Sequence, residues 1–405
     1  MDAAIRLFRT GGMTIGWIMV VPCLAILLGA IIPVVPWFRI YAATVLPNHT
    51  PWLLLWSILA LLIGLLAHSR QRSRITIALV ATSIVSIAVT TFVLLRLLYV
   101  AEANGARINM MWALELREIS SGAKPDESHV YSRRPGEDLW LDVYHPGPTE
   151  AGGLSPVIVA VHGGGFFQGS RSFGAANLRW FADHGWTVIS IDYRLARSDR
   201  PTWNLAIRDV ECALAWTAAN ANALRIDLNR VALTGGSAGG TLAMSAGYLA
   251  NAKRTDPECS GNIPHIAAIV TKVPLIDVIG SWNNVAELRD EQRSYLTRYI
   301  GGSPTDFPER YGAVDVRRFR FPTNPPTLIV GGASDPIVNP EGAADFARKA
   351  NASGLKVRHI LFPYSGHDFN TTYDSITNQA MRQIAAQFII DQGAGPKLPG
   401  LTLTD

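Results

Sequence analysis

The chain has 405 residues, of which 48% are hydrophobic and only 17% are charged, and its formal net charge is +4. Soluble domains carry about 25% charged residues. The deficit lies almost wholly in the first hundred positions, so the composition excludes a chain that is soluble throughout. The length predicts more than one structural unit. The basic residues form no long run and do not alternate with aromatic residues, which excludes nucleic acid as an expected partner.

Three apolar runs occupy the N-terminal part of the chain: Ile15–Val35, Pro51–Ala67 and Ile75–Leu95. A helix that spans a bilayer needs about 17–25 apolar residues, and in lipid its backbone polar groups must be paired within the segment. We therefore expect a transmembrane unit of three helices over residues 1–100. The first run could instead be a cleaved signal peptide, but it lacks a clear small-residue cleavage site and two apolar runs follow it.

The arginines beside these runs predict an orientation. Arg6 and Arg9 precede the first run, three more arginines lie in the segment 68–74 between the second and third runs, and only Arg39 lies between the first and second. Cytoplasmic loops are enriched in Lys and Arg. With three spans both basic segments face the cytoplasm, so we expect a multi-pass protein of the cell membrane whose C-terminal part is extracytoplasmic.

Residues 101–130 are expected to form a connector that begins with a helix over Ala101–Ile119 and continues as a linker. From residue 131 to residue 392, short β-branched runs alternate with helical stretches, which is typical of an α/β fold with a mostly parallel sheet. The stretch 275–322 shows no such alternation and is expected to contribute to a cap, and residues 393–405 form a tail.

The expected elements of this domain can be stated by range. The strands are Leu139–Tyr144, Val157–Val161, Val188–Ile191, Val231–Leu233, Ile266–Val270, Thr327–Val330 and Val357–Phe362. The helices are Asn204–Leu224, Ala238–Ala250, Pro340–Ser353 and Ile376–Asp391. Strands of this length and composition are typical of a parallel sheet that is buried on both faces.

The strongest local motif is the sequence Gly-Gly-Ser-Ala-Gly-Gly at 235–240, with Ser237 at its centre. It follows a predicted strand and opens a predicted helix, which is the context that a G-x-S-x-G nucleophile elbow requires. Gly235 and Gly239 allow the strand and the helix to approach closely. The alternative is a tight glycine turn before a helix, and the motif alone does not decide between the two.

A second glycine motif, His162-Gly163-Gly164-Gly165-Phe166, follows another predicted strand. Backbone N–H groups in such a loop can point at a developing oxyanion because no side chain intervenes. The alternatives are a flexible loop or a phosphate-binding loop, but no P-loop lysine follows.

Two further polar residues come directly after predicted strands. Asp335 follows Thr327–Val330, and His367 follows Val357–Phe362. Ser237, Asp335 and His367 occur in the chain order of the α/β-hydrolase triad, and each is placed at the edge of the sheet where α/β enzymes carry their sites. Asp368 is a second candidate for the acid, ranked below Asp335 because it lacks the strand-end context. Asp192 and Asp209 are assigned to structural hydrogen bonding.

Five stretches together resemble the hormone-sensitive-lipase-like branch of the α/β-hydrolase family, which includes bacterial carboxylesterases and feruloyl-esterase-like proteins. They are His162–Phe166, Ser190–Leu195, Gly235–Gly240, Ser334–Pro336 and Gly366–Phe369. The resemblance covers residues 130–392 and implies a serine esterase or lipase without a cofactor, with the N–H groups of Gly164, Gly165 and Ala238 as oxyanion donors. The chain departs from the pattern at Gly236, where many relatives carry Asp, and after Leu195, where Pro-Glu is often found.

The expected function is hydrolysis of a small-molecule or lipid carboxylic ester, with membrane lipids as partners of the N-terminal helices. Three rivals stay open at this stage: a membrane acyltransferase that uses the same triad, a peptidase of the same fold, and a non-catalytic binding module. No metal-ligand spacing such as C-x-x-C is present. Cys23 lies in an apolar run, and for Cys212 and Cys259 we favour buried or free thiols over a disulfide.

Overall fold

The computed structural model describes residues 2–32, 36–120, 122–134, 136–147, 153–283, 288–397 and 402–403, and only the backbone of residues 2–11, 31, 36 and 289. The chain forms two compact units. The first consists of residues 1–117, 332–334 and 362–380, and the second of residues 118–331, 335–361 and 381–405. The first unit therefore combines the N-terminal helices with two short segments that follow strands of the second.

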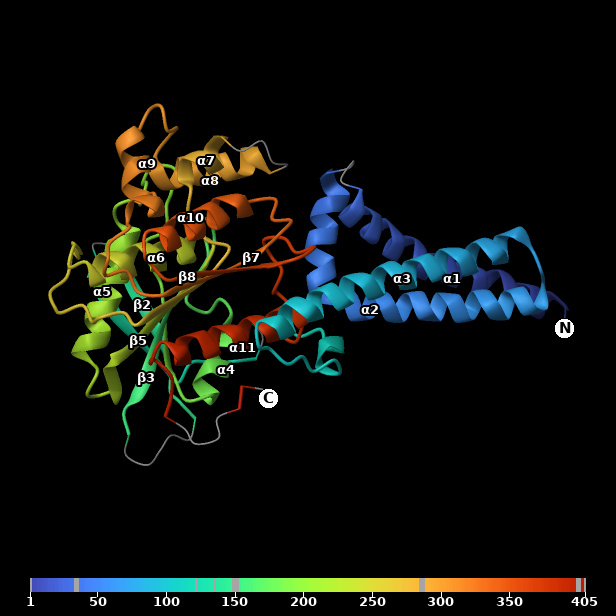
Figure 1. Ribbon diagram of the computed structural model, residues 1–405, viewed down its shortest axis with the longest axis horizontal. Coiled ribbons are helices and arrows are strands. Elements are labelled where there is room, and N and C mark those ends of the chain that lie inside the picture. The colour runs from blue at the N-terminus through green and yellow to red at the C-terminus, as the bar shows by residue number, and fades with distance from the viewer. Residues whose placement is uncertain are drawn as a thin grey trace. The chain divides into compact units, whose positions relative to one another are not determined.

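Three long helices dominate the first unit (Figure 1). They are α1 (Asp2–Ile31), α2 (Pro36–Arg70) and α3 (Arg74–Ala103). Each contains a stretch that is long and apolar enough to cross a membrane, which confirms the expectation of three such helices. The second begins well before the predicted start at Pro51, and it is broken at His49, whose φ of −135° and ψ of 15° are not helical.

The prediction of a connector helix over Ala101–Ile119 was wrong. Helix α3 ends at Ala103, and Gly105 adopts a φ of +91°, a left-handed conformation that ends helices. Only the short 3-10 helix η1 (Trp112–Leu114) lies in the following segment. This segment is held on α2, because the indole Nε1 of Trp52 donates a hydrogen bond to the carbonyl of Leu114 at 3.0 Å.

The segment 362–380 of the first unit is bonded to the chain that follows α3. Arg117 forms an ion pair with Asp374 at 2.8 Å. The side-chain amide of Gln379 accepts a hydrogen bond from the backbone N–H of Asn109 at 2.8 Å and donates one to its carbonyl at 3.1 Å. These contacts fix the second half of the segment.

A sheet of eight strands forms the centre of the second unit, in the order β1-β2-β4-β3-β5-β6-β7-β8. The strands are β1 (Glu127–Arg134), β2 (Glu137–Tyr144), β3 (Ser155–Val161), β4 (Thr187–Ile191), β5 (Ile226–Gly236), β6 (Ala268–Lys272), β7 (Thr327–Gly332) and β8 (Val357–Phe362). Strands β4, β3, β5, β6 and β7 pair in parallel, and β2 pairs antiparallel with β1 and β4. Every residue of β3 and β4 is buried, as the continuous β-branched runs predict.

Helices flank this sheet (Figure 1). They are α4 (Ala175–Asp183), α5 (Ala206–Ala219), α6 (Ala238–Asn251), α7 (Val278–Asn283), α8 (Arg289–Ile300), α9 (Pro308–Val314), α10 (Pro340–Ala352) and α11 (Ile376–Asp391), with the 3-10 helix η2 (Val316–Arg318). The structure confirms α5, α6, α10 and α11. Strand β1 and helix α4 were not predicted, and α7, α8 and α9 lie within the stretch that was assigned to a cap.

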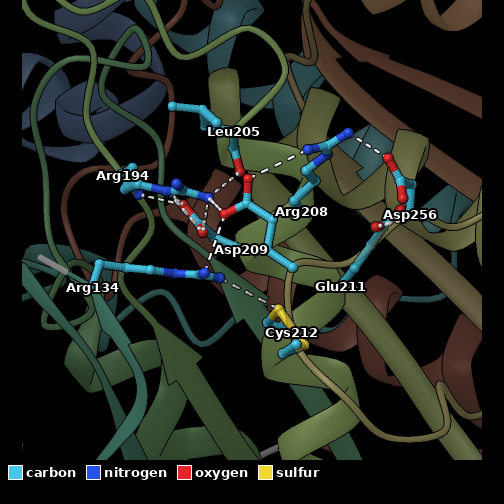
Figure 2. Close-up of a disulfide and its surroundings, with 10 residues drawn as sticks. Arg134, Arg194, Leu205, Arg208, Asp209, Glu211, Cys212 and Asp256 are labelled. Carbon is cyan, nitrogen blue, oxygen red and sulfur yellow. Dashed lines mark hydrogen bonds and ion pairs between the residues drawn. A yellow bond between two sulfur atoms is a disulfide. The ribbon is translucent and has the colours of Figure 1, made fainter.

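The expectation that Cys212 and Cys259 are buried or free thiols and not a disulfide was wrong. The two residues form a disulfide, with Cα atoms 5.7 Å apart (Figure 2). Cys212 lies on α5, and the chain that leaves α6 returns to that helix at Cys259. Sequence separation alone says nothing about such a return, which depends on where the chain runs after α6.

Ion pairs lie beside the disulfide, and Figure 2 shows Arg194 directed at Asp209 and Arg134 directed at Cys212. Arg194, in the loop after β4, binds Asp209 of α5 at 2.7 Å and Glu258 at 2.9 Å. Asp209 is fully buried, so removal of its partner Arg194 would leave a poorly compensated buried charge at a cost of about 3–5 kcal/mol. Asp192 in the same loop binds Arg171 at 2.7 Å. The assignment of Asp192 and Asp209 to structural hydrogen bonding is confirmed.

We expect the disulfide to contribute measurably to stability. It closes a loop with a sequence separation of 47, for which the chain-entropy relation gives about 4 kcal/mol. Replacement of both cysteines by alanine should lower the midpoint of thermal unfolding by about 8–16 °C, as measured by circular dichroism in detergent. Reduction of the unaltered chain should give the same shift, and an unchanged midpoint in both experiments would contradict the expectation.

Candidate active site

Ser237 occupies the turn between β5 and α6. Its φ of 51° and ψ of −124° lie in a sparsely populated region for a residue with a side chain. Its N–H donates to the carbonyl of Lys272 at 2.8 Å, which ties the turn to the end of β6. A Cβ atom at Gly235 would lie 2.4 Å from the carbonyl oxygen of Gly239, so only glycine permits this approach of strand and helix. These backbone contacts keep Ser237 in its strained conformation.

The glycine loop after β3 is in direct contact with this turn. A Cβ atom at Gly163 would lie 3.0 Å from the carbonyl of Gly236 and 3.5 Å from the Cβ of Ser237. At Gly164, where φ is +120°, a Cβ atom would lie 2.0 Å from the carbonyl of Gln168. The loop therefore requires glycine for close approach at one position and for left-handed backbone at the next.

His162 supports this loop through its backbone and its ring. Its Nδ1 lies 2.7 Å from the carbonyl oxygen of Gly163. The ring stacks on Tyr193 with centroids 4.4 Å apart, and the Tyr193 hydroxyl donates to the His162 carbonyl at 3.1 Å. Burial lowers the pKa of His162, so the imidazole is neutral near neutral pH. A neutral Nδ1–H donates to the Gly163 carbonyl, which is a structural role.

Helix α8 packs against the same glycine loop. The ring of Tyr299 stacks on Phe166 with centroids 3.7 Å apart, and Tyr295 lies 4.9 Å from Phe167. The guanidinium of Arg298 lies 4.7 Å from the centroid of the Phe167 ring. None of these α8 residues was predicted from the sequence to belong to the site. The sequence pattern that could have identified them is their spacing of three and four residues from Tyr295. This spacing places Tyr295, Arg298 and Tyr299 on one helix face.

The space beside Gly236 is filled by the side chain of Lys272. A Cβ atom at this position would lie 2.5 Å from Cε of Lys272. The lysine stem thus covers the glycine where many relatives carry Asp, and its Nζ lies 5.6 Å from the centre of the Phe173 ring. A cation and an aromatic ring therefore stand beside the serine turn in place of a carboxylate.

Asp335 and Asp368 differ sharply in environment. Asp335, just after β7, is 6% exposed, and its Oδ1 accepts hydrogen bonds from the N–H groups of Ile337 at 2.8 Å and Val338 at 2.9 Å. Asp368 is exposed. A carboxylate that is buried and oriented by two backbone donors is preorganised, whereas an exposed one is not.

His367 lies in the loop after β8 and is half-buried. Within the first unit, the carbonyl of Ser365 accepts a hydrogen bond from the N–H of Ser334 at 2.8 Å, so the loops that follow β7 and β8 touch. The structure brings the serine turn and the glycine loop together in the second unit. Ser237 and Asp335 belong to that unit and His367 to the first, and the convergence of all three stays a prediction.

The family of the chain follows from a sequence comparison. The profile of the BD-FAE family matches residues 141–350, which include the glycine loop, the serine turn and Asp335. The chain belongs to the BD-FAE family. His367 lies beyond the matched segment.

Curated relatives of this BD-FAE chain include two esterases of Mycobacterium tuberculosis. Esterase LipC is 30% identical over 280 residues, covering 65% of this chain and 66% of LipC. Esterase LipQ is 26% identical over 238 residues, covering 58% of this chain and 55% of LipQ. The matches thus span a little over half to just under two thirds of these relatives.

Solved structures are similar in fold. An esterase of Thermogutta terrifontis with bound propionate superposes with a TM-score of 0.55 at 24% identity, covering 69% of this chain and 98% of that esterase. Esterase LipW of Mycobacterium marinum has a TM-score of 0.52 at 23% identity, covering 77% of this chain and 91% of LipW. Together with the mostly parallel sheet of eight strands, these similarities confirm the α/β-hydrolase fold. Among the described residues, no group of three His, Cys, Asp or Glu side chains could hold a metal ion.

Proposed function

We propose that this BD-FAE chain is a membrane-anchored serine hydrolase that cleaves carboxylic esters through an acyl-enzyme on Ser237. One observation carries the proposal: Ser237 has strained backbone angles at the strand–helix turn and lies against Gly163 of the glycine loop. Such a turn lifts a nucleophile clear of the backbone and next to N–H donors. The esterase activity that names LipC and LipQ supports the reaction type.

The proposed reaction uses residues from both glycine motifs and both strand-end loops. His367 accepts the proton of the Ser237 hydroxyl as it attacks the acyl carbonyl, and Asp335 orients the imidazole and stabilises its protonated form. The N–H groups of Gly164, Gly165 and Ala238 bind the oxyanion, and each such donor typically contributes about 10²–10³-fold in rate. The alcohol leaves with the proton from His367, and water then cleaves the acyl-enzyme with His367 again as base.

The assay that tests this proposal uses the full chain in detergent micelles. We expect a fluorophosphonate probe to label Ser237, and p-nitrophenyl esters of increasing acyl length to be hydrolysed. Analysis of the products with water alone and with an added alcohol separates hydrolysis from acyl transfer. Absence of both labelling and turnover would refute the enzyme assignment, and ester products in place of free acid would reassign the chain to acyl transfer.

We further propose that helices α1, α2 and α3 cross the cell membrane and that the hydrolase domain, residues 131–392, is extracytoplasmic. Arg70, Arg72 and Arg74, which lie at the end of α2, in the following loop and at the start of α3, support this orientation through the positive-inside rule. The disulfide between Cys212 and Cys259 supports it independently, because disulfides persist outside the reducing cytoplasm.

Labelling with a membrane-impermeant maleimide tests the orientation in spheroplasts of a bacterial host. Asp199→Cys introduces a thiol at an exposed position of the hydrolase domain, and Gln71→Cys introduces one in the loop between α2 and α3. We expect the thiol at position 199 to react in intact spheroplasts and the thiol at position 71 only after lysis. The opposite pattern would invert the topology.

A further inference from the structure

The loop that carries His367 is bonded on both sides of that residue to helix α2. Within the first unit, the N–H of Gly366 donates to the carbonyl of Ala43 at 2.8 Å. The side-chain amide of Asn48 donates to the carbonyl of Asp368 at 2.9 Å. His367 is thus flanked by two residues that are held by the same short stretch of one helix.

Two prolines four residues apart in α2 leave two backbone carbonyls of that helix without a helical hydrogen-bond donor. Proline has no N–H, so the carbonyl four residues before it loses its helical partner. Pro47 releases the carbonyl of Ala43 in this way, and Pro51 releases that of Pro47. The first carbonyl binds Gly366, and the second lies 3.2 Å from the hydroxyl of Thr377. The carbonyls that the prolines release are therefore the ones that contact the segment 362–380.

Asn48 uses its whole amide in this arrangement. It is 2% exposed, and its Nδ2 also donates to the carbonyl of Thr44 at 2.8 Å. Its Oδ1 accepts a hydrogen bond from the N–H of Thr372 at 3.1 Å. An amide side chain has two donor hydrogens and one acceptor oxygen, and all are paired here. Asn48 begins the sequence Asn-His-Thr, which is an acceptor pattern for N-glycosylation. The burial of Asn48 excludes this modification in the folded chain.

We propose that the broken turn of α2, residues 43–51, positions the imidazole of His367 for catalysis, with Asn48 as its principal side chain. The inference rests on the proposed function, because it concerns the base of that triad. A helix of the membrane unit then takes part in orienting the base. With three spans, residues 36–50 and the chain after α3 lie on the same side of the bilayer, as these contacts require.

The first test replaces Asn48 by alanine in the full chain in detergent micelles. Misplacement of a catalytic group by about 1 Å can cost on the order of 10²-fold in rate. We expect kcat to fall by about 10–100-fold with KM within about twofold of the original value. The rate of fluorophosphonate labelling should fall in parallel, while the final labelled fraction, which counts folded sites, stays the same.

Ser57→Ala is the matched control for this variant. Ser57 is also buried on α2, but its hydroxyl donates to the carbonyl of Leu53 at 2.7 Å and contacts the Ser86 hydroxyl of α3 at 2.8 Å. Removal of the Ser57 hydroxyl therefore removes buried hydrogen bonds of α2 and α3, neither of which involves the His367 loop. We expect Ser57→Ala to keep the original kcat and labelling rate.

The second test separates positioning from stability. Pro47→Ala restores an N–H to the helix, and this N–H competes with the N–H of Gly366 for the carbonyl of Ala43. Alanine has a much higher helix propensity than proline in a helix interior. We therefore expect the midpoint of thermal unfolding to stay or rise while kcat falls by about tenfold. Pro22→Ala makes the same repair in α1 and should leave kcat unchanged.

The outcomes separate the two proposals. If the unaltered chain is active and both Asn48→Ala and Pro47→Ala keep its kcat, the positioning role is refuted and the esterase assignment stands. If the unaltered chain neither hydrolyses esters nor reacts with the probe, the proposed function fails and the inference fails with it. If Asn48→Ala loses labelled fraction through misfolding, the Pro47→Ala result decides.

Discussion

Replacement of Ser237 by alanine is expected to lower hydrolysis of a short p-nitrophenyl ester by about 10³-fold or more. Without the hydroxyl no acyl-enzyme forms, and what remains is the residual effect of the oxyanion donors and of binding. Steady-state kinetics of the full chain measures the loss. Alanine is compatible with the close packing at this turn, although it does not relieve the strained φ of 51°.

Ser245→Ala provides the control for that experiment. Ser245 is buried on α6, the same helix that Ser237 precedes, so its replacement removes a hydroxyl from this helix without touching the turn. We expect this variant to keep its turnover and its fluorophosphonate labelling. Unchanged turnover in Ser237→Ala would discard the assignment of the nucleophile.

The second large effect is expected from Asp335→Asn, which should lower kcat by about 10²–10⁴-fold. The amide removes the negative charge and favours the wrong imidazole tautomer. Its Oδ1 can still accept the N–H groups of Ile337 and Val338, so the local fold is retained. The measurement is kcat for the same p-nitrophenyl ester, alongside the midpoint of thermal unfolding.

Asp368→Asn is the matched comparison, because it makes the same chemical change one residue after His367. The Asp368 side chain is exposed, and substitutions at exposed positions usually change free energies by less than about 0.5 kcal/mol. We expect kcat to stay within about threefold of the original value. A collapse of activity in Asp368→Asn, with Asp335→Asn active, would transfer the role of the acid to Asp368.

The failures of sequence reasoning have a common cause. The helix predicted over Ala101–Ile119 had the right apolar spacing, but Gly105 ended α3 and the segment packed on α2 instead. Strand β1 was missed because its burial pattern is mixed, and it becomes a strand by pairing with β2. In the segment after Gly105 and in β1, contacts with other segments decided the structure.

The role inferred for α2 had a signal in the sequence that was not used. Pro47 and Pro51 lie four residues apart within a long apolar helix, a spacing that releases two successive carbonyls on one helix face. A buried carbonyl needs a partner, so such a pair predicts that another segment binds there. The sequence does not say which segment does so.

The sequence by itself determined the three apolar helices, the parallel sheet, the strand–turn–helix context of Ser237 and the glycine loop after β3. These follow from hydrophobic period, β-branched runs and turn chemistry, which act over a few residues. Only the tertiary structure decided that Cys212 pairs with Cys259, that α8 lines the glycine loop and that α2 holds the residues beside His367. Those contacts join residues far apart in the chain, and each forms because a group buried by folding requires a partner that the rest of the fold brings to it.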